Sequence, residues 1–258
     1  MIDLKDIQRL KSLRILLIGD SCVDHYHYGV CERMSPEAPV PIFKVLDTYK
    51  SGGMAHNVKA NLEGMGISVY LLTNDEEIIK SRYIDKKTRQ HLLRTDWGEA
   101  KKIVPLKPKE LDSIDFDLFD VVVISDYDKG FLTKSDIETI CGKHNNVFID
   151  SKKVLGSWAS GARYIKINET EYKRSKETIT SEIQEKIIQT RGAEGCLFRG
   201  IAYSVTKAEV KDVCGAGDSF LAALVVKFLE EENIEESIKY ANYCASQVVT
   251  RRGVSVIP

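Results

Sequence analysis

The sequence predicts an α/β fold with a doubly wound, mainly parallel sheet and helices on both of its faces. Short apolar runs rich in β-branched residues alternate with helical patterns, an order that is typical of βαβ crossovers. These runs are apolar at nearly every position, as expected for strands that are buried on both faces. The predicted strands span 14–18, 68–73, 121–124, 147–149 and 164–167.

Helical patterns occupy the segments between and after these strands, at 53–63, 134–141, 218–231 and 235–250. Polar clusters directly follow several of the strands, at 20–24, 125–130, 150–152 and 168–171. Ligands of open parallel sheets bind beyond the carboxyl ends of the strands. We therefore expect the chemistry of this protein to reside in those polar clusters.

Two stretches, 26–49 and 79–96, break the alternation of strands and helices. Both have the pattern of exposed antiparallel strands, and 26–49 contains three prolines. They predict a small β-strand flap, or lid, over the site, while a plain surface hairpin remains the alternative. Because the sequence contains no repeat and no Pro/Gly/Ser-rich linker, we expect one domain over 1–258.

The composition excludes several classes of protein. Lys and Arg number 37 and Asp and Glu 38, so the chain lacks the basic excess of a general nucleic-acid binder. No apolar run approaches the ~18 residues of a membrane span. The 6 cysteines form no Cys-x-x-Cys pair and the 5 histidines no metal-spaced set. Scattered single thiols without an export signal indicate a reducing cytoplasm.

The strongest motif is Asp212-Val-Cys-Gly-Ala-Gly-Asp218, which runs directly into an apolar helix. The backbone N–H groups of Gly215, Ala216 and Gly217 can converge on one point, where the helix N-terminus adds positive partial charge. Such an anion hole suits a phosphoryl group in transfer, and Asp218 beside it can accept a proton from an attacking hydroxyl. A tight glycine turn with Asp218 as an ordinary N-cap is the alternative on spacing alone.

This motif resembles the C-terminal signature of the ribokinase/PfkB family of sugar kinases. The paired N-terminal signature of that family is matched by Gly52-Gly53-Met-Ala-His-Asn57, and the resemblance runs from about residue 13 to residue 258. It implies a ribokinase-like fold, transfer of a phosphoryl group from ATP, a requirement for Mg²⁺, and a homodimer formed through the flap. It implies no nucleic-acid or membrane partner.

Within that family the sequence is most similar to the heptose 7-phosphate kinases of bacterial lipopolysaccharide precursor synthesis. The most specific match is Arg33-Met-Ser-Pro-Glu-Ala-Pro-Val-Pro41, followed by Ser125-Asp-Tyr-x-Lys-Gly130. Gly19-Asp20-x-x-x-Asp24 and Ile149-Asp-x-Lys152 also match. The resemblance implies phosphorylation at O1 of D-glycero-β-D-manno-heptose 7-phosphate.

The resemblance also implies roles for individual residues. The sugar contacts would be Asp24, Gly52, Gly53, Asn57 and Asp126, while Asp218 with Gly215, Ala216 and Gly217 would catalyse the transfer. Asn168 and Glu171 match an Asn-x-x-Glu that positions Mg²⁺ and phosphate, often through water. The nucleotide would meet Asn168, Thr190, Gly192, Gly195 and Asn242. A helix cap followed by a surface Glu is the alternative for Asn168 and Glu171, and a simple β-turn is the alternative for 190–195.

A heptose 7-phosphate also needs cations for its distal phosphate. The basic candidates near the expected loops and flap are Arg82, Arg94, Lys129 and Lys152, each with a solvated surface charge as its alternative.

Three departures from the family keep other functions open. The chain is short after Thr73 and again between Ser181 and Thr190, where the family has further elements. Arg251-Arg-Gly-Val254 stands where the family often supports a monovalent cation, so K⁺ binding stays open. A kinase for another sugar or sugar phosphate, or a non-catalytic sugar- or nucleotide-binding module derived from such a kinase, is the alternative function.

Overall fold

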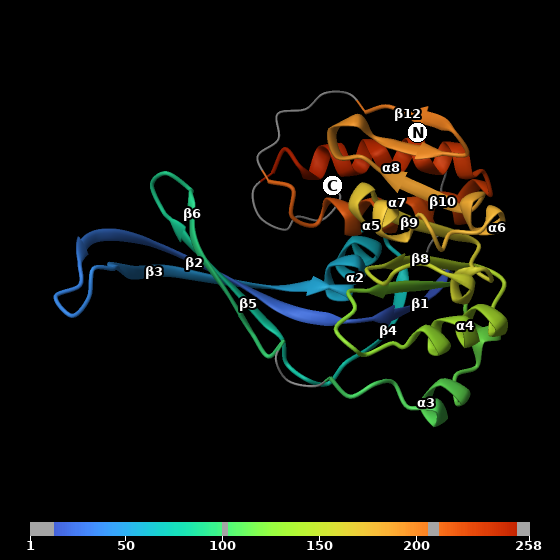
Figure 1. Cartoon of the computed structure of the whole chain (residues 1–258), viewed down its shortest axis with the longest axis horizontal. Helices are drawn as coiled ribbons and strands as arrows, with labels where there is room; N and C mark the ends of the chain where they lie inside the picture. Colours follow the sequence, from blue (N-terminus) through green and yellow to red (C-terminus); the bar gives the residue numbers. More distant parts are fainter. Residues whose placement is uncertain (1–12, 100–102, 206–211, 252–258) are drawn as a thin grey trace.

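The computed structural model describes residues 13–99, 103–205 and 212–251. Over these residues the strands form two sheets, of eight strands in the order β12-β11-β10-β9-β8-β7-β1-β4 and of four in the order β3-β2-β5-β6. The neighbours from β4 through β10 pair in parallel, whereas β11 and β12 are antiparallel. Figure 1 shows the small sheet as an arm that projects from the body. The predicted fold class, a mainly parallel sheet with a small β flap, is confirmed.

The eight strands of the large sheet are β1 (Arg14–Gly19), β4 (Ser68–Thr73), β7 (Val121–Asp126), β8 (Val147–Ser151), β9 (Tyr164–Asn168), β10 (Ile187–Thr190), β11 (Cys196–Phe198) and β12 (Ile201–Tyr203). The small sheet contains β2 (Ser21–Met34), β3 (Pro41–Met54), β5 (Ile79–Asp85) and β6 (His91–Trp97). The α-helices are α2 (Ala55–Gly64), α3 (Pro108–Asp112), α4 (Lys134–Lys143), α5 (Glu169–Ser175), α6 (Ser181–Gln184), α7 (Ala216–Glu231) and α8 (Ile234–Val248). Short 3₁₀ turns occur at η1 (Phe116–Leu118), η2 (Ser157–Ala159) and η3 (Gly192–Glu194).

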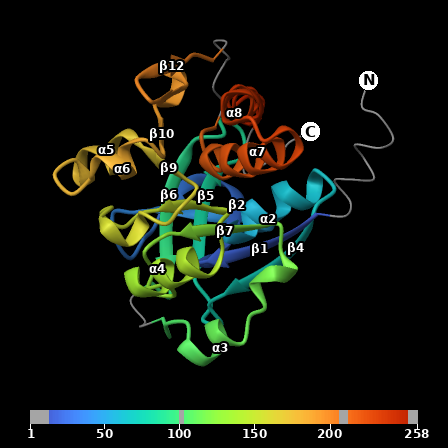
Figure 2. The same cartoon turned by 90° about the vertical axis from the view of Figure 1, so that its right-hand side faces the viewer.

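The large sheet is buried on both faces because alternate residues of each strand enter different cores. Ile15 and Leu17 of β1 pack in one core with α2, α7 and α8. Leu16 and Ile18 of the same strand pack in the other core with α3 and α4. Figure 2 shows the first set of helices on one side of the strands and the second set on the other. This two-sided burial explains why the strand sequences are apolar without alternation.

The flap grows directly out of the large sheet, since a single residue, Asp20, separates β1 from β2. At the base of β2, the alternate residues Cys22, Asp24 and Tyr26 are buried, whereas the outer end of the strand is exposed. The stretches 26–49 and 79–96 fall within the four flap strands and their turns, and β2 begins earlier, at Ser21. The buried base of the flap therefore lies at the carboxyl end of β1.

Two helix starts bear on the site. The helix expected from residue 53 begins at Ala55, because Met54 adopts the left-handed conformation (φ 57°) and the two preceding glycines still belong to β3. The helix expected from residue 218 begins at Ala216, after the left-handed Gly215 (φ 79°). Asp218 therefore lies in the first turn of α7.

No α-helix in the three described ranges combines the length and the apolar character needed to cross a bilayer.

Candidate active site

The first turn of α7 faces the carboxyl ends of β7, β8 and β9 across a cavity of about 730 Å³. Gly215, Ala216, Gly217 and Asp218 all line this cavity. The N–H groups of a helical first turn lack intrahelical acceptors, so they can bind an anion there. A Cβ atom at Gly217 would lie 2.9 Å from Nζ of Lys166, so a larger residue there would displace the end of that lysine.

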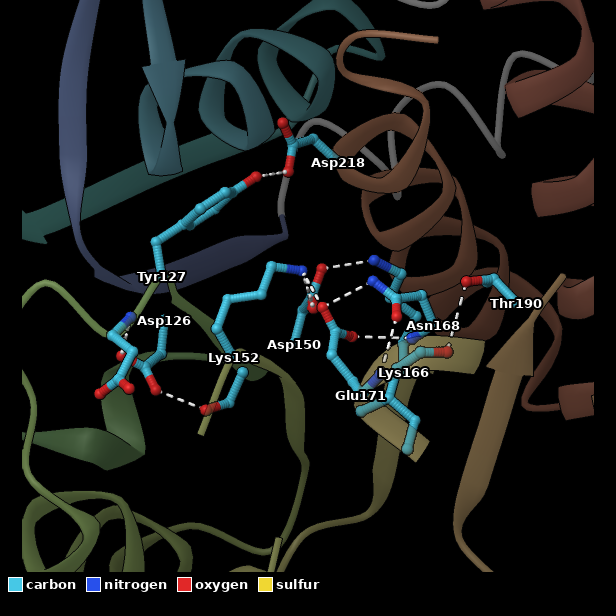
Figure 3. A network of polar contacts seen from close by, with 12 residues as sticks. Asp126, Tyr127, Asp150, Lys152, Lys166, Asn168, Glu171, Thr190 and Asp218 are labelled. Carbon is cyan, nitrogen blue, oxygen red and sulfur yellow. Dashed lines mark hydrogen bonds and ion pairs between the residues drawn. The ribbon is translucent and has the colours of Figure 1, made fainter. Parts of the chain in front are cut away.

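Asp218 is buried, and both of its carboxylate oxygens receive hydrogen bonds. The amide of Asn57 on α2 donates to Oδ2 at 2.7 Å. The hydroxyl of Tyr127 donates to Oδ1 at 2.6 Å (Figure 3). Burial raises the pKa of Asp218 above its usual value, although these two hydrogen bonds act in the opposite direction. Its carboxylate is therefore a stronger base than that of an exposed aspartate.

A buried ion pair lies beside the anion-binding turn. Nζ of Lys166 is 2.6 Å from Oδ2 of Asp150, and both side chains are nearly inaccessible to solvent. Burial alone would raise the pKa of Asp150, but the charges of Lys166 and Lys152 outweigh it and the pKa is lowered. The floor of the cavity thus carries an ionised carboxylate next to a buried ammonium group.

Asn168 and Glu171 form a reciprocal cap at the start of α5. Asn168 Oδ1 accepts the Glu171 N–H at 2.9 Å, and Glu171 Oε2 accepts the Asn168 N–H at 2.7 Å. Glu171 is nevertheless buried, and Lys152 Nζ lies 2.6 Å from its Oε1 (Figure 3). The alternative, a helix cap followed by a surface glutamate, is therefore right about the cap. It is wrong about the glutamate, because Glu171 is buried in the polar network beside the cavity.

The residues around this network fit a magnesium ion that keeps most of its water. Asp150 lines the cavity, and its buried Oδ1 accepts no hydrogen bond, although Nζ of Lys152 lies 3.6 Å away. Within the described ranges, no three His, Cys, Asp or Glu side chains are arranged to hold a metal by themselves. Magnesium needs few carboxylates when water and phosphate oxygens complete its shell, so Asp150, Glu171 and Asn168 are the residues here that could hold it.

The residues expected to contact a nucleotide line the far end of the cavity. Thr190, Gly192 and Gly195 line it, and the 3₁₀ turn between them takes the place of the simple β-turn alternative. Asn242 also lines it and fixes the end of β12 by donating to the Tyr203 carbonyl at 2.9 Å. The remaining wall is apolar and is formed by Val205, Val213, Phe220, Ala245 and Val249.

The expected sugar-contact residues gather at the base of the flap. Asp24 is buried and accepts a hydrogen bond from Arg82 of β5 at 2.5 Å. Gly53 leaves room for the Asp24 carboxylate, because a Cβ atom at residue 53 would lie 2.3 Å from Oδ2 of Asp24. Gly52 precedes it on β3, and Asn57 links this corner to Asp218. The corner that holds the expected sugar contacts is therefore joined to the anion-binding turn through the hydrogen bond between Asn57 and Asp218.

The geometry does not favour the expected role of Asp126 in sugar binding. Its carboxylate is buried, pairs with Lys153 at 2.8 Å and accepts the hydroxyl of Ser151. These partners already occupy the carboxylate, and Asp126 is not among the residues that line the cavity. The neighbouring Tyr127 reaches the site instead.

The four expected phosphate-binding cations do not form one cluster. Arg82 and Arg94 face each other on β5 and β6, but Arg94 is paired with Asp96 at 2.7 Å. Lys129 is paired with Glu99 at 2.8 Å. Lys152 pairs with Glu171 and lines the cavity, whereas Arg82 and Arg94 do not line it. Residues 252–254, which bear on K⁺ binding, lie outside the described residues.

Three side chains at the centre of the site had no assigned role from the sequence: Tyr127, Asp150 and Lys166. Tyr127 and Asp150 lie within the matched motifs, but the motifs alone do not indicate what either side chain does. Lys166 had a signal, since a lysine inside an apolar strand is rarely buried without a partner.

The comparisons with known proteins agree with this architecture. The model of the pfkB family carbohydrate kinases matches residues 52–258. The bifunctional protein HldE of Nitratiruptor sp. is 31% identical over 290 residues, covering 94% of this chain, and that of Campylobacter jejuni is 34% identical over 287 residues, covering 93%. The chain spans about 62% of the length of these relatives.

Solved structures share the fold at low sequence identity. Ribokinase from Thermotoga maritima superposes with a TM-score of 0.67 at 17% identity, covering 95% of this chain and 96% of that one. Phosphofructokinase-2 from Escherichia coli gives a TM-score of 0.67 at 13% identity, with 95% of each chain covered.

The raised pKa of Asp218 predicts that Asp218→Asn stabilises the protein at neutral and alkaline pH. The folded state binds the carboxyl proton more tightly than the unfolded state does, so this contribution is present below the unfolded-state pKa and is lost as the pH rises through the folded-state pKa. The variant should gain in melting temperature over the wild type as the pH rises from 4 to 8. A gain of about 1 kcal/mol corresponds to roughly 2–4 °C for a domain of this size.

Circular-dichroism melts across that pH range measure the difference. Asp117→Asn, at an exposed position, is the matched control and should leave the melting temperature unchanged. An Asp218→Asn variant that is equally or less stable at pH 8 contradicts the prediction.

Proposed function

Because the chain belongs to the pfkB family of carbohydrate kinases, we propose that it transfers the γ-phosphoryl group of ATP to O1 of a sugar phosphate, D-glycero-β-D-manno-heptose 7-phosphate. The observation that carries the kinase reaction is the position of Asp218, buried beside the open N-terminus of α7 and linked to the acceptor corner through Asn57. The heptose assignment is supported by Arg33–Pro41 and Ser125–Gly130, and by the HldE relatives.

The geometry suggests how the two substrates would bind. ATP would lie along the cavity, with its base against the apolar wall and its phosphates at the first turn of α7. Lys166 and Lys152 would neutralise phosphate charge from the opposite side of the cavity. The sugar would occupy the corner formed by Asp24, Asn57 and Gly53 under the flap.

Transfer then needs one proton movement and one in-line displacement. Asp218 takes the proton of the O1 hydroxyl as that oxygen forms its bond to the γ-phosphorus. The bond between the γ-phosphorus and the β,γ-bridging oxygen breaks, and ADP leaves. Asp150, Glu171 and Asn168 would hold Mg²⁺, which would supply charge neutralisation on the phosphates. Positioning and electrostatic stabilisation account for most of the catalysis in such reactions.

We further propose that the protein is a homodimer whose subunits meet through the flap. Of the fifteen large apolar side chains exposed among the described residues, eight belong to flap strands or the turn between β2 and β3. They are Met34, Val40, Val45, Leu46, Tyr49, Leu92, Leu93 and Trp97. An apolar surface of this extent on one projecting sheet is typical of an interface.

Asp218→Asn should reduce kcat by roughly 10²-fold or more, the low end of what a positioned general base contributes. The KM for ATP should change little, because the anion-binding groups of the turn are backbone N–H groups. A coupled assay of ADP release measures both constants. Turnover close to that of the wild type would show that Asp218 is not the base.

The acceptor is identified by comparing kcat/KM for heptose 7-phosphate, fructose 6-phosphate, fructose and ribose at one concentration of Mg²⁺ and ATP. Heptose 7-phosphate should exceed the unphosphorylated sugars by about ten- to a hundredfold, the contribution of a charge-assisted phosphate contact. Equal or better use of an unphosphorylated sugar contradicts the heptose assignment and leaves the kinase reaction standing. Better use of fructose 6-phosphate points to a different sugar phosphate.

The dimer is tested by sedimentation velocity at micromolar protein. The wild type should sediment as a dimer, and Leu93→Glu should shift it toward monomer by placing a charge on the exposed apolar surface of β6. Tyr243→Glu, an exposed position on α8, is the matched control and should stay dimeric. A wild type that sediments as a monomer contradicts the proposal.

A further inference from the structure

Tyr127 lies between the nucleotide cavity and the acceptor corner. Its side chain lines the cavity together with the first turn of α7. Its hydroxyl donates to Oδ1 of Asp218 at 2.6 Å, and Nζ of Lys152 lies 5.4 Å from the centre of its ring. We propose that Tyr127 is a positioning residue, which holds the Asp218 carboxylate ionised and in one orientation for the acceptor hydroxyl. This inference rests on the proposed function of Asp218 as the base.

The backbone that carries Tyr127 is fixed without any ligand. The buried carboxylate of Asp20 accepts the N–H groups of Tyr127 at 2.8 Å, Lys129 at 3.2 Å and Phe131 at 3.3 Å. Between them, Asp128 adopts a left-handed conformation (φ 56°) that the rest of the turn must enforce. Three hydrogen bonds to Asp20 thus hold the turn that carries Tyr127 against the end of β1, and this fixes the backbone from which the tyrosine hydroxyl reaches Asp218.

The second contact on Asp218 comes from a different element. Asn57 of α2 holds Oδ2, so the two donors grip the carboxylate from opposite parts of the fold. With both oxygens held, the side chain cannot rotate away when a substrate enters. An amide donor alone would leave Oδ1 without a fixed direction.

The charges around Asp218 explain why a hydroxyl donor is needed. Asp150 of β8 opposes its ionisation and Lys166 of β9 favours it, while burial acts against the charged form. Lys152 and Cys22 also interact with it. Tyr127 itself remains protonated, because burial and the charge of Asp218 raise its pKa well above the usual value. The hydroxyl therefore remains a donor at neutral pH.

The test is the pH dependence of Tyr127→Phe, which removes the hydroxyl and keeps the ring. Loss of a hydrogen bond to the ionised form makes the carboxylate harder to ionise. The acid limb of kcat/KM should move to higher pH by about one unit, so that activity falls about tenfold on the acid side of the profile and recovers toward the wild-type value on its alkaline side. The assay uses whichever acceptor the sugar panel identifies. The KM for ATP should change little.

Tyr172→Phe is the matched control, because its hydroxyl also donates to a side chain, Oε1 of Gln184, at 2.9 Å. It should leave the acid limb in place. If Tyr127→Phe lowers activity by the same factor at every pH, or leaves the profile unchanged, the positioning role is overturned.

A second measurement needs no substrate and separates this inference from the proposed function. Urea unfolding of the wild type and Tyr127→Phe is compared from pH 4 to pH 8. The stability difference should grow as Asp218 ionises, because the hydrogen bond to a carboxylate is stronger than that to a carboxylic acid. In an Asp218→Asn background the difference should be independent of pH. If no sugar is phosphorylated, the proposed function fails while this comparison still decides the contact; a difference independent of pH in the wild-type background overturns it.

Discussion

The proposed reaction depends on keeping one buried carboxylate, Asp218, available as a base. Asp218 must be enclosed, so that phosphoryl transfer is shielded from water, yet enclosure disfavours its charged form. The fold offsets this with two directed donors, Asn57 from α2 and Tyr127 from the turn after β7. The positive end of α7 acts on the same group. The positions of α2, α7 and the β7 turn are therefore coupled, and the packing of all three against β1 and β7 secures the chemistry.

The parallel sheet makes this convergence possible. Consecutive neighbours in the sheet end at one edge, so residues from distant parts of the chain arrive side by side. Asp20 follows β1, Tyr127 follows β7, and Asp150, Asn168 and Thr190 lie at the ends of β8, β9 and β10. Because both faces of the sheet are fully packed, this edge is where polar groups can remain accessible. The site is a consequence of strand direction as much as of any single motif.

The alternation of apolar runs and helical patterns was enough to predict the fold class and the edge at which the site lies. It was not enough to predict which of two adjacent residues in a motif faces the site. Asp126 and Tyr127 stand in the same string, but the first turns toward Lys153 and the second toward Asp218. Which way a side chain points after the last strand residue depends on the turn, and this turn is set by Asp20, far away in sequence. Lys166 was missed for a related reason, since its partner Asp150 lies on another strand.

The four cations expected to bind a distal phosphate were predicted from their charge alone, without regard to the carboxylates that pair with them. All four cations have carboxylate partners, so an incoming phosphate would have to exchange with one of them. The pair between Arg82 and Asp24 is buried, and breaking such a pair leaves an uncompensated charge at a cost of about 3–5 kcal/mol. The pair between Arg94 and Asp96 is partly exposed, and pairs of that kind contribute about 0–1 kcal/mol. Arg94 can therefore change partners far more readily than Arg82. The flap would present Arg94 to a distal phosphate, while Arg82 holds Asp24 in place for the sugar.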